Sequence, residues 1–144
     1  MSMTDVVSAT ADRFYNFNGA SSNSQSLDSQ TYNIVPFACD VKKLTVSVFA
    51  APGAGNTRET VLRKNGSSTA LTATLGAADL TKQDNVNVVT LAADDLVNWM
   101  TTPVSNPSAP TRYRMGAVVY IAPAVGGGSA IPAMMHQYRR RRVA

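Results

Sequence analysis

Residues 60 to 75 read TVLRKNGSSTALTATL and contain the clearest structural signal in the chain. Two runs rich in Thr, Val and Leu flank the dipeptide Asn65-Gly66. This dipeptide favours the tight turn of a β-hairpin because both residues tolerate the positive φ angles that such a turn needs. From Leu71 to Leu75, apolar residues alternate with threonines, as in a strand with one buried face. We therefore predict a hairpin with strands over 60–64 and 69–75.

Five further segments on either side have the same character. Leu44, Val46 and Val48 alternate with polar residues, and turn-forming clusters separate each segment from the next. Segment 76–84 is ambiguous between a helical turn and a crossing loop, and the prolines of 103–110 are expected to end the preceding strand. No long run has helical periodicity. Strands are thus predicted over 31–37, 44–50, 86–91, 96–102 and 112–122.

Seven short strands joined by turns predict an all-β fold, an antiparallel β-sandwich with jelly-roll-like connections. The length of 144 residues and the mass of 15.3 kDa fit one domain with extensions. We expect an N-terminal arm and polar loop over 1–30, a body over 31–125, and a glycine hinge with a basic docking tail over 126–144.

The charge of the chain is concentrated at its end. Of 13 basic residues, four are the consecutive arginines at 139–142, which account for the whole formal net charge of +4. A nucleic-acid-binding domain usually spreads Lys and Arg over one face. Here the excess positive charge lies in a terminal segment, which could meet an acidic protein surface, a phosphate backbone or solvent alone.

The composition narrows the class of protein further. Apolar residues make up 44% and charged residues 15%, which favours a packed body over a disordered chain. No apolar run reaches the roughly 20 residues of a membrane span, and no signal peptide is evident at the N-terminus. The lone Cys39 excludes an internal disulfide and fits folding in a reducing compartment.

Residues for catalysis or metal binding are scarce. His136 is the only histidine, so a Ser–His or Cys–His relay would require the tail to fold back over the body. Glu59 is the only glutamate, so paired carboxylates would have to come from aspartates. Asp94-Asp95 could contribute to a calcium site, but we interpret the pair as turn capping. The glycine-rich segments at 53–55 and 126–128 lack the Lys-Ser/Thr pair of a phosphate-binding loop. We predict no enzymatic activity and no metal or cofactor.

Aromatic and apolar residues near both ends are the candidate partner-binding groups. Trp99 alternates with Val97 on a predicted strand, which indicates core or inter-subunit packing; a sugar-stacking platform is the alternative. In the tail, a short helix starting near Pro132 would gather apolar side chains on one side. The alternative is a frayed tail. The candidate anchors are Phe14, Tyr15, Phe17, Met134, Met135, Tyr138, Arg139, Arg140, Arg141 and Arg142.

The hairpin and its surroundings resemble a known pattern. Arg63-Lys64-Asn65-Gly66, then Thr69 to Leu75, then Ala93-Asp94-Asp95-Leu96-Val97 are similar to turns in small viral and bacterial surface jelly rolls. The likeness covers residues 44–122. It is a resemblance to TNF/C1q-like trimeric jelly rolls and to head decoration (cement) and fibre-tip proteins of tailed bacteriophages. It implies a fold and a trimer, but no catalytic or ligand residues.

Two functional hypotheses follow. In the first, the chain is a structural virion protein that assembles in the host cytoplasm. As a homotrimer it would decorate a phage capsid, binding the major capsid protein or another virion protein through its arm and tail. In the second, it is a tail-fibre-tip or lectin-like trimer that binds a host glycan through loops 51–57 or 103–111. A weaker third hypothesis has the arginine tail bind packaged nucleic acid.

Overall fold

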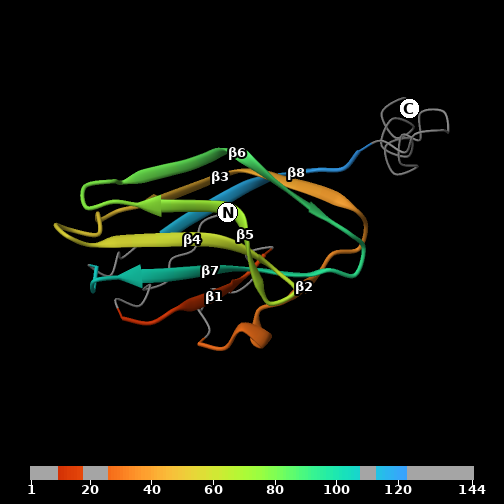
Figure 1. Cartoon of the computed structure of the whole chain (residues 1–144), viewed down its shortest axis with the longest axis horizontal. Coiled ribbons are helices and arrows are strands. Elements are labelled where there is room, and N and C mark those ends of the chain that lie inside the picture. The colour runs from red at the N-terminus through yellow and green to blue at the C-terminus, as the bar shows by residue number, and fades with distance from the viewer. Residues whose placement is uncertain (1–9, 18–25, 108–112, 123–144) are drawn as a thin grey trace, which may run out of the picture.

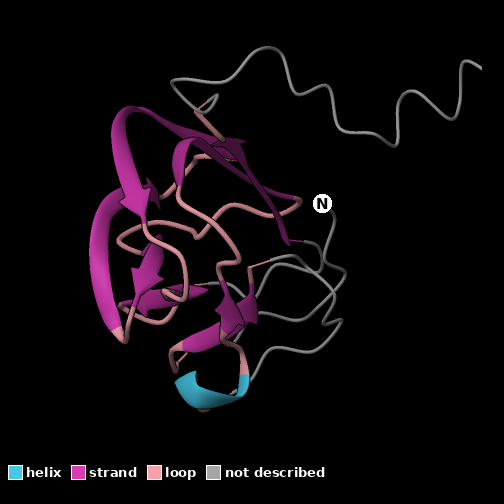
Figure 2. Cartoon of the chain, turned by 90° about the vertical axis from the view of Figure 1, so that its right-hand side faces the viewer, coloured by secondary structure: helices cyan, strands magenta, loops and turns pink. Residues whose placement is uncertain are grey.

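Two antiparallel β-sheets, packed face to face, make up the body of the protein (Figure 1). The computed structural model describes residues 10–17, 26–107 and 113–122. The strands are β1 (Arg13–Asn16), β2 (Asn33–Ile34), β3 (Cys39–Val48), β4 (Thr57–Lys64), β5 (Ser67–Leu75), β6 (Thr81–Leu91), β7 (Leu96–Val104) and β8 (Tyr113–Tyr120). One 3-10 turn, η1 (Asp28–Gln30), lies at the margin of the strands (Figure 2). The predicted all-β sandwich is confirmed.

The eight strands of the described residues form two sheets that enclose the core. The first sheet has the order β1-β7-β4-β5, with β2 also pairing with β7. The second sheet has the order β6-β3-β8. The core lies between them, because every second side chain of a strand points inward. Its largest aliphatic side chains, each fully buried, are Leu44, Leu62, Leu71, Leu75 and Leu91.

The hairpin expected from Asn65-Gly66 is formed by β4 and β5. Asn65 has a φ of 50° and Gly66 a φ of 79°, the two positive values that a tight hairpin turn requires. The alternation predicted for β3 is also confirmed: Leu44, Val46 and Val48 are buried, whereas the residues between them are only partly covered.

Several strand boundaries differ from those expected. β3 begins at Cys39 instead of residue 44, because a bulge at Lys43, whose φ is 57°, interrupts the apolar alternation. β6 begins at Thr81, so the end of the ambiguous segment 76–84 is strand. β7 continues through Pro103, which pairs with Arg58 of β4. Proline is tolerated there because β1 pairs with β7 only as far as Thr101 among the described residues.

The segment 31–37 is mostly not a strand. Only the two residues of β2 pair with β7, at Leu96 and Val97. The Val35 amide then donates to the Asp95 carbonyl at 2.9 Å, and the Asp94 amide donates to the Val35 carbonyl at 2.8 Å. Pro36, which has no amide hydrogen, follows directly. The chain therefore leaves the sheet early and turns towards β3 at one end of the body.

Candidate functional site

The described residues contain no group of three or more His, Cys, Asp or Glu side chains that could hold a metal ion. His136 lies outside these residues. Cys39 is buried, and burial, followed by the nearby Asp40 carboxylate, raises the pKa of its thiol. No helix among the described segments is long and apolar enough to span a membrane.

Asp95 is engaged in turn contacts, as the capping interpretation of Asp94-Asp95 predicted. Its Oδ2 accepts the Ala92 amide at 2.7 Å and lies 2.9 Å from Lys64 Nζ, and its Oδ1 accepts Asn65 Nδ2 at 2.7 Å. The Lys64 ammonium and these hydrogen bonds lower the pKa of Asp95 to about 2. The carboxylate therefore joins the turn before β7 to the β4–β5 turn.

A second acidic side chain, Asp84, links the two sheets. Its Oδ2 accepts the Thr72 amide of β5 at 3.1 Å, and Oδ1 accepts the Val86 and Asn87 amides at 3.1 and 3.0 Å. Burial raises the pKa of Asp84, but the hydrogen bonds from Asn87, Thr72 and Val86 lower it by more, so it lies below its ordinary value. A carboxylate with this many donors stays ionised and holds β6 beside β5.

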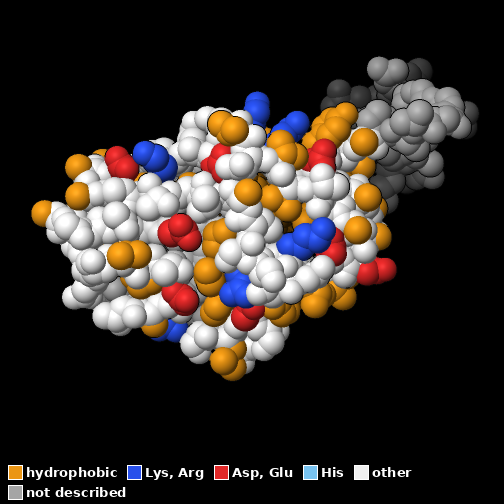
Figure 3. Space-filling view, in the orientation of Figure 1, with side chains coloured by type: hydrophobic (Ala, Val, Ile, Leu, Met, Phe, Trp, Pro, Cys, Tyr) orange, Lys and Arg blue, Asp and Glu red, His pale blue; other side chains and the backbone are white. Residues whose placement is uncertain are grey.

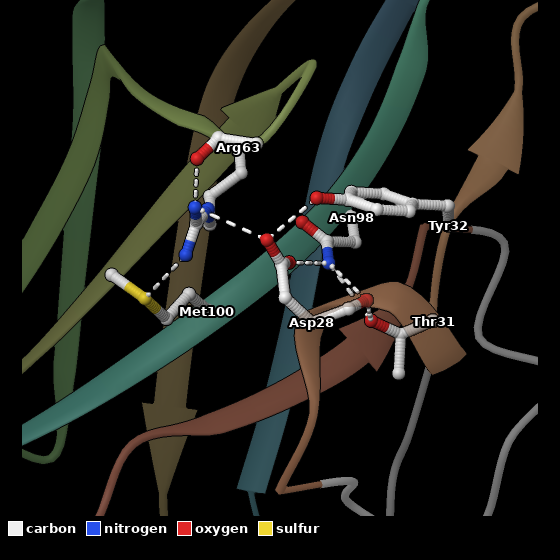
Figure 4. Close-up of polar contacts among 7 residues, drawn as sticks. Asp28, Thr31, Tyr32, Arg63, Asn98 and Met100 are labelled. Atoms are coloured by element: carbon white, nitrogen blue, oxygen red, sulfur yellow. Dashed lines mark hydrogen bonds and ion pairs between the residues drawn. The ribbon is translucent and has the colours of Figure 1, made fainter.

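Asp28 is the centre of a polar cluster that attaches η1 to the first sheet (Figure 4). Its Oδ2 lies 3.1 Å from Arg63 NH2 and accepts the Tyr32 hydroxyl at 2.6 Å. Its Oδ1 accepts Asn98 Nδ2 at 2.5 Å. Because both carboxylate oxygens already have partners in this chain, the cluster is a structural clamp. Nothing in the sequence pattern indicated it, since Asp28 and Asn98 are 70 positions apart.

Arg63 connects this clamp to the hairpin turn. Its guanidinium donates to the Gly66 carbonyl and to Met100 Sδ, the latter at 3.3 Å. It also lies over the ring of Phe14, with 5.3 Å between its Cζ and the ring centroid. The hairpin turn, η1 and β1 are thus coupled through one side chain.

A buried cation lies between the sheets. Arg58 is 1% exposed, and this desolvation lowers the pKa of its guanidinium. Electrostatic interaction with the neighbouring Tyr113 and Tyr15 raises the pKa, but by less. Tyr113 shares a hydrogen bond with the Thr60 hydroxyl, and burial raises the pKa of Tyr113. Alternation from Leu62 back through Thr60 could have placed Arg58 on the inner face, but its charge argued against a core position.

The three aromatic residues expected in a free arm lie in or against this chain's own body. Phe14 and Tyr15 are buried in β1, and Tyr15 stacks on Tyr113 with 6.5 Å between ring centroids. Phe17 is partly buried and stacks on Trp99 at 5.7 Å. Trp99 is itself 2% exposed, which places it in the core and excludes it as an open sugar platform. A strand of four residues carried too weak a pattern to show that it pairs with β7.

The other candidate anchors lie outside the described residues: Met134, Met135, Tyr138, Arg139, Arg140, Arg141 and Arg142. The structure therefore locates only the first three candidates, Phe14, Tyr15 and Phe17. Of these three, Phe17 borders an open surface feature.

That feature is an apolar groove of about 140 Å³ at the end of the body where β8 stops. It lies between the early turn at Pro36 and the second sheet. A second depression, also about 140 Å³, shares Cys39 with it and extends to Ala122. The groove is lined by Phe17, Asn33, Ile34, Val35, Pro36, Phe37, Cys39, Leu91, Val97 and Val119.

Six exposed apolar side chains lie in and beside these depressions. We call them the β8 end patch: Ile34, Phe37, Val118, Val119, Tyr120 and Ile121, each between 45% and 66% exposed. Hydrophobic side chains gather at this right-hand end of the molecule in Figure 3. Side chains on both faces of β8 are exposed here, which the alternation of its sequence could not show.

A smaller groove lies near loop 51–57. Ser47, Val48, Phe49 and Arg114 enclose about 120 Å³, and Phe49 is 66% exposed. The groove thus combines an exposed aromatic ring with the hydrogen-bond donors of a guanidinium group.

Comparison with protein-family models and with curated proteins finds no match to this chain.

Proposed function

We propose that the chain is a structural virion protein of a tailed bacteriophage, a capsid decoration protein that binds the outer shell. In this proposal the body is a jelly roll, three copies form a homotrimer, and the partner is the major capsid protein or another virion protein. Assembly takes place in the host cytoplasm. Binding across neighbouring shell subunits stabilises the shell because a ligand that binds only the closed form lowers its free energy.

The observation that carries the proposal is the β8 end patch, together with its position in the chain. Exposed apolar surface of this kind marks protein contacts. The patch lies where the described body ends, and the sequence that follows contains Met134, Met135, Tyr138 and the four arginines. In this proposal the patch serves the contact between copies of the chain, and the apolar and basic residues that follow it in the sequence serve the contact with the shell.

The apolar groups of the tail are assigned most of its binding energy. Exposed ion pairs between the arginines and shell carboxylates contribute under about 1 kcal/mol each. Buried aromatic and methionine side chains dominate interfaces when they fill a pocket. The arginines then increase the association rate more than the lifetime of the complex.

The test is co-sedimentation with shells of the phage that encodes the chain, stripped of their decoration. The full chain is compared with Met134→Ser/Met135→Ser and with a matched surface control, Lys82→Gln, on β6. We expect the double variant to lose at least tenfold in shell affinity and the control to bind as the parent does. Equal shell binding by all three proteins would refute the role of the tail, and absence of binding by the parent would refute decoration itself.

The nucleic-acid hypothesis is tested in the same series. Binding of the parent to double-stranded DNA is measured at 50 and 200 mM salt. Contact between four arginines and phosphates would weaken affinity steeply with salt, by roughly 100-fold over this range. Weak or salt-insensitive binding would eliminate it.

A second function, recognition of a host glycan, is favoured by the groove at Phe49 and Arg114. Phe49 offers a stacking face beside loop 51–57, and Arg114 offers hydrogen-bond donors to hydroxyl or carboxylate groups. Binding of the purified protein to host polysaccharide, lost in Phe49→Ala and retained in Phe37→Ala at the other end, would support this function. Absence of binding by the parent protein would remove it.

A further inference from the structure

The β8 end patch contains no charged side chain, although charged groups lie at its margin. Lys42 Nζ lies 4.9 Å from the centroid of the Tyr120 ring, and Asp40 accepts the Thr90 hydroxyl at 2.8 Å. These opposite charges are used within the chain. The patch therefore has no charge that would select an acidic or a basic partner. Apolar interfaces with few charges are typical of contacts between identical subunits.

The area of the patch agrees with an interface of ordinary size. Full burial of a Val or Ile side chain corresponds to about 60–120 Å², and that of an aromatic residue to about 150–250 Å². Since all six side chains are about half exposed, a partner would cover roughly 400 Å² of apolar surface on each copy. A stable interface covers about 800 Å² per partner, of which roughly 450–520 Å² is apolar.

The backbone beside the patch is also available. β8 is the last strand of its sheet, so one of its edges has no neighbouring strand among the described residues. From Met115 to Ala122 the sequence contains no charge and no proline. The other edge strands are protected from pairing. The edge strand β6 carries Lys82 and Asp84, β1 has only four residues, and β5 lies beside β6, where Asp84 accepts the Thr72 amide.

We propose that the β8 end patch binds a second copy of this chain, with the open edge of β8 at the contact. An identical strand can always supply the amide and carbonyl groups that this edge lacks. The inference rests on the part of the proposed function in which copies of the chain associate, and it assigns a surface to that association. Two identical edges that pair are related by a twofold axis, so this contact gives a dimer, and a trimer needs a different surface. It requires neither a shell nor a glycan.

The test is the mass of the full chain in solution, measured by light scattering at protein concentrations from about 1 to about 100 μM, which span micromolar dissociation constants. The parent is compared with Ile121→Asp and, separately, Val119→Lys. The matched control is Val86→Lys on β6, where an equally apolar side chain is 87% exposed and lies outside the patch. Thermal unfolding of each variant verifies that it is folded.

We expect an oligomeric parent and control, and at least a tenfold higher dissociation constant for both patch variants. A monomeric parent over the whole range would overturn the inference, including the case in which the chain's own tail covers the patch. Unchanged mass in the patch variants would overturn it as well. Ile121 follows the last residue of β8, so Ile121→Asp still decides the question if Val119→Lys fails to fold. If the parent protein forms the oligomer but does not bind the shell, the decoration proposal is refuted and the inference about the patch is not.

Discussion

Replacement of Gly66 by alanine tests whether the hairpin turn and the Asp28 clamp act as one unit. Gly66 has a φ of 79°, where an added Cβ costs about 1–2 kcal/mol. The same Cβ would lie 3.3 Å from the Tyr32 hydroxyl, which is tighter than ordinary contact. Tyr32 must then move, and its hydrogen bond to the Asp28 carboxylate is weakened.

Gly55 is the matched control for this change. Its φ is 75°, and no heavy atom lies within 4 Å of an added Cβ. Both substitutions reduce the entropy of the unfolded chain equally, by about 0.4–1 kcal/mol. We expect Gly55→Ala to cost about 1 kcal/mol net. Gly66→Ala should cost about 1 kcal/mol more, because a hydrogen bond to a charged group contributes about 1.5–3 kcal/mol and is only partly lost.

The assay is equilibrium unfolding in urea, with the free energy of unfolding extrapolated to water. A third protein, Gly66→Ala/Tyr32→Phe, removes the hydroxyl that obstructs the new Cβ. In a Tyr32→Phe background the extra cost of Gly66→Ala should fall to within about 0.5 kcal/mol of the Gly55→Ala cost. Equal costs of the two glycine substitutions, or an extra cost that persists without the hydroxyl, would refute this coupling.

Three further outcomes are expected. Leu71→Ala, in the fully buried core, should lower the free energy of unfolding by about 2–5 kcal/mol, whereas Val86→Ala should change it by less than about 0.5 kcal/mol in the same urea titration. The pKa of Asp84 is lower in the folded than in the unfolded state, so its contribution is complete above about pH 4 and is lost as the pH falls through the folded value. Asp84→Asn should therefore be less stable at pH 7 and show a shallower loss of stability below pH 4; an unchanged acid slope would contradict this. Cys39, buried and with a raised pKa, should react with a disulfide reagent at pH 8 at least tenfold more slowly in the native protein than in urea, and equal rates would show that the thiol is open.

Sequence reasoning was most accurate where the signal is local. Asn65-Gly66 predicted its turn because backbone preference alone decides such a dipeptide. The boundaries of β3 and β6 were wrong because charged residues such as Lys43 break the alternation without ending the strand. The role of Phe14 and Tyr15 as free anchors was predicted from their position near the N-terminus. Their actual place depends on pairing with β7, more than 80 residues away.

The β8 end patch also depends on contacts between distant residues and not on local sequence. The run Val118 to Ile121 lies in the strand predicted over 112–122, but a strand prediction does not show which of its faces are covered. Whether they are covered depends on what lies opposite. Val119 pairs with the buried Val41 and lines the groove beside Pro36, whereas Val118 and Tyr120 pair with Lys42 and Asp40, which are only partly buried.

The sequence by itself determined the all-β class, the hairpin, the turn at Asp95 and the concentration of positive charge at residues 139–142, because each depends on neighbours in the chain. Only the tertiary structure decided that Arg58 is buried, that Asp28 clamps η1 to Arg63 and Asn98, and that β8 ends beside an open groove. These features arise between residues tens of positions apart. Their free energy depends on packing and desolvation, which a one-dimensional pattern does not encode.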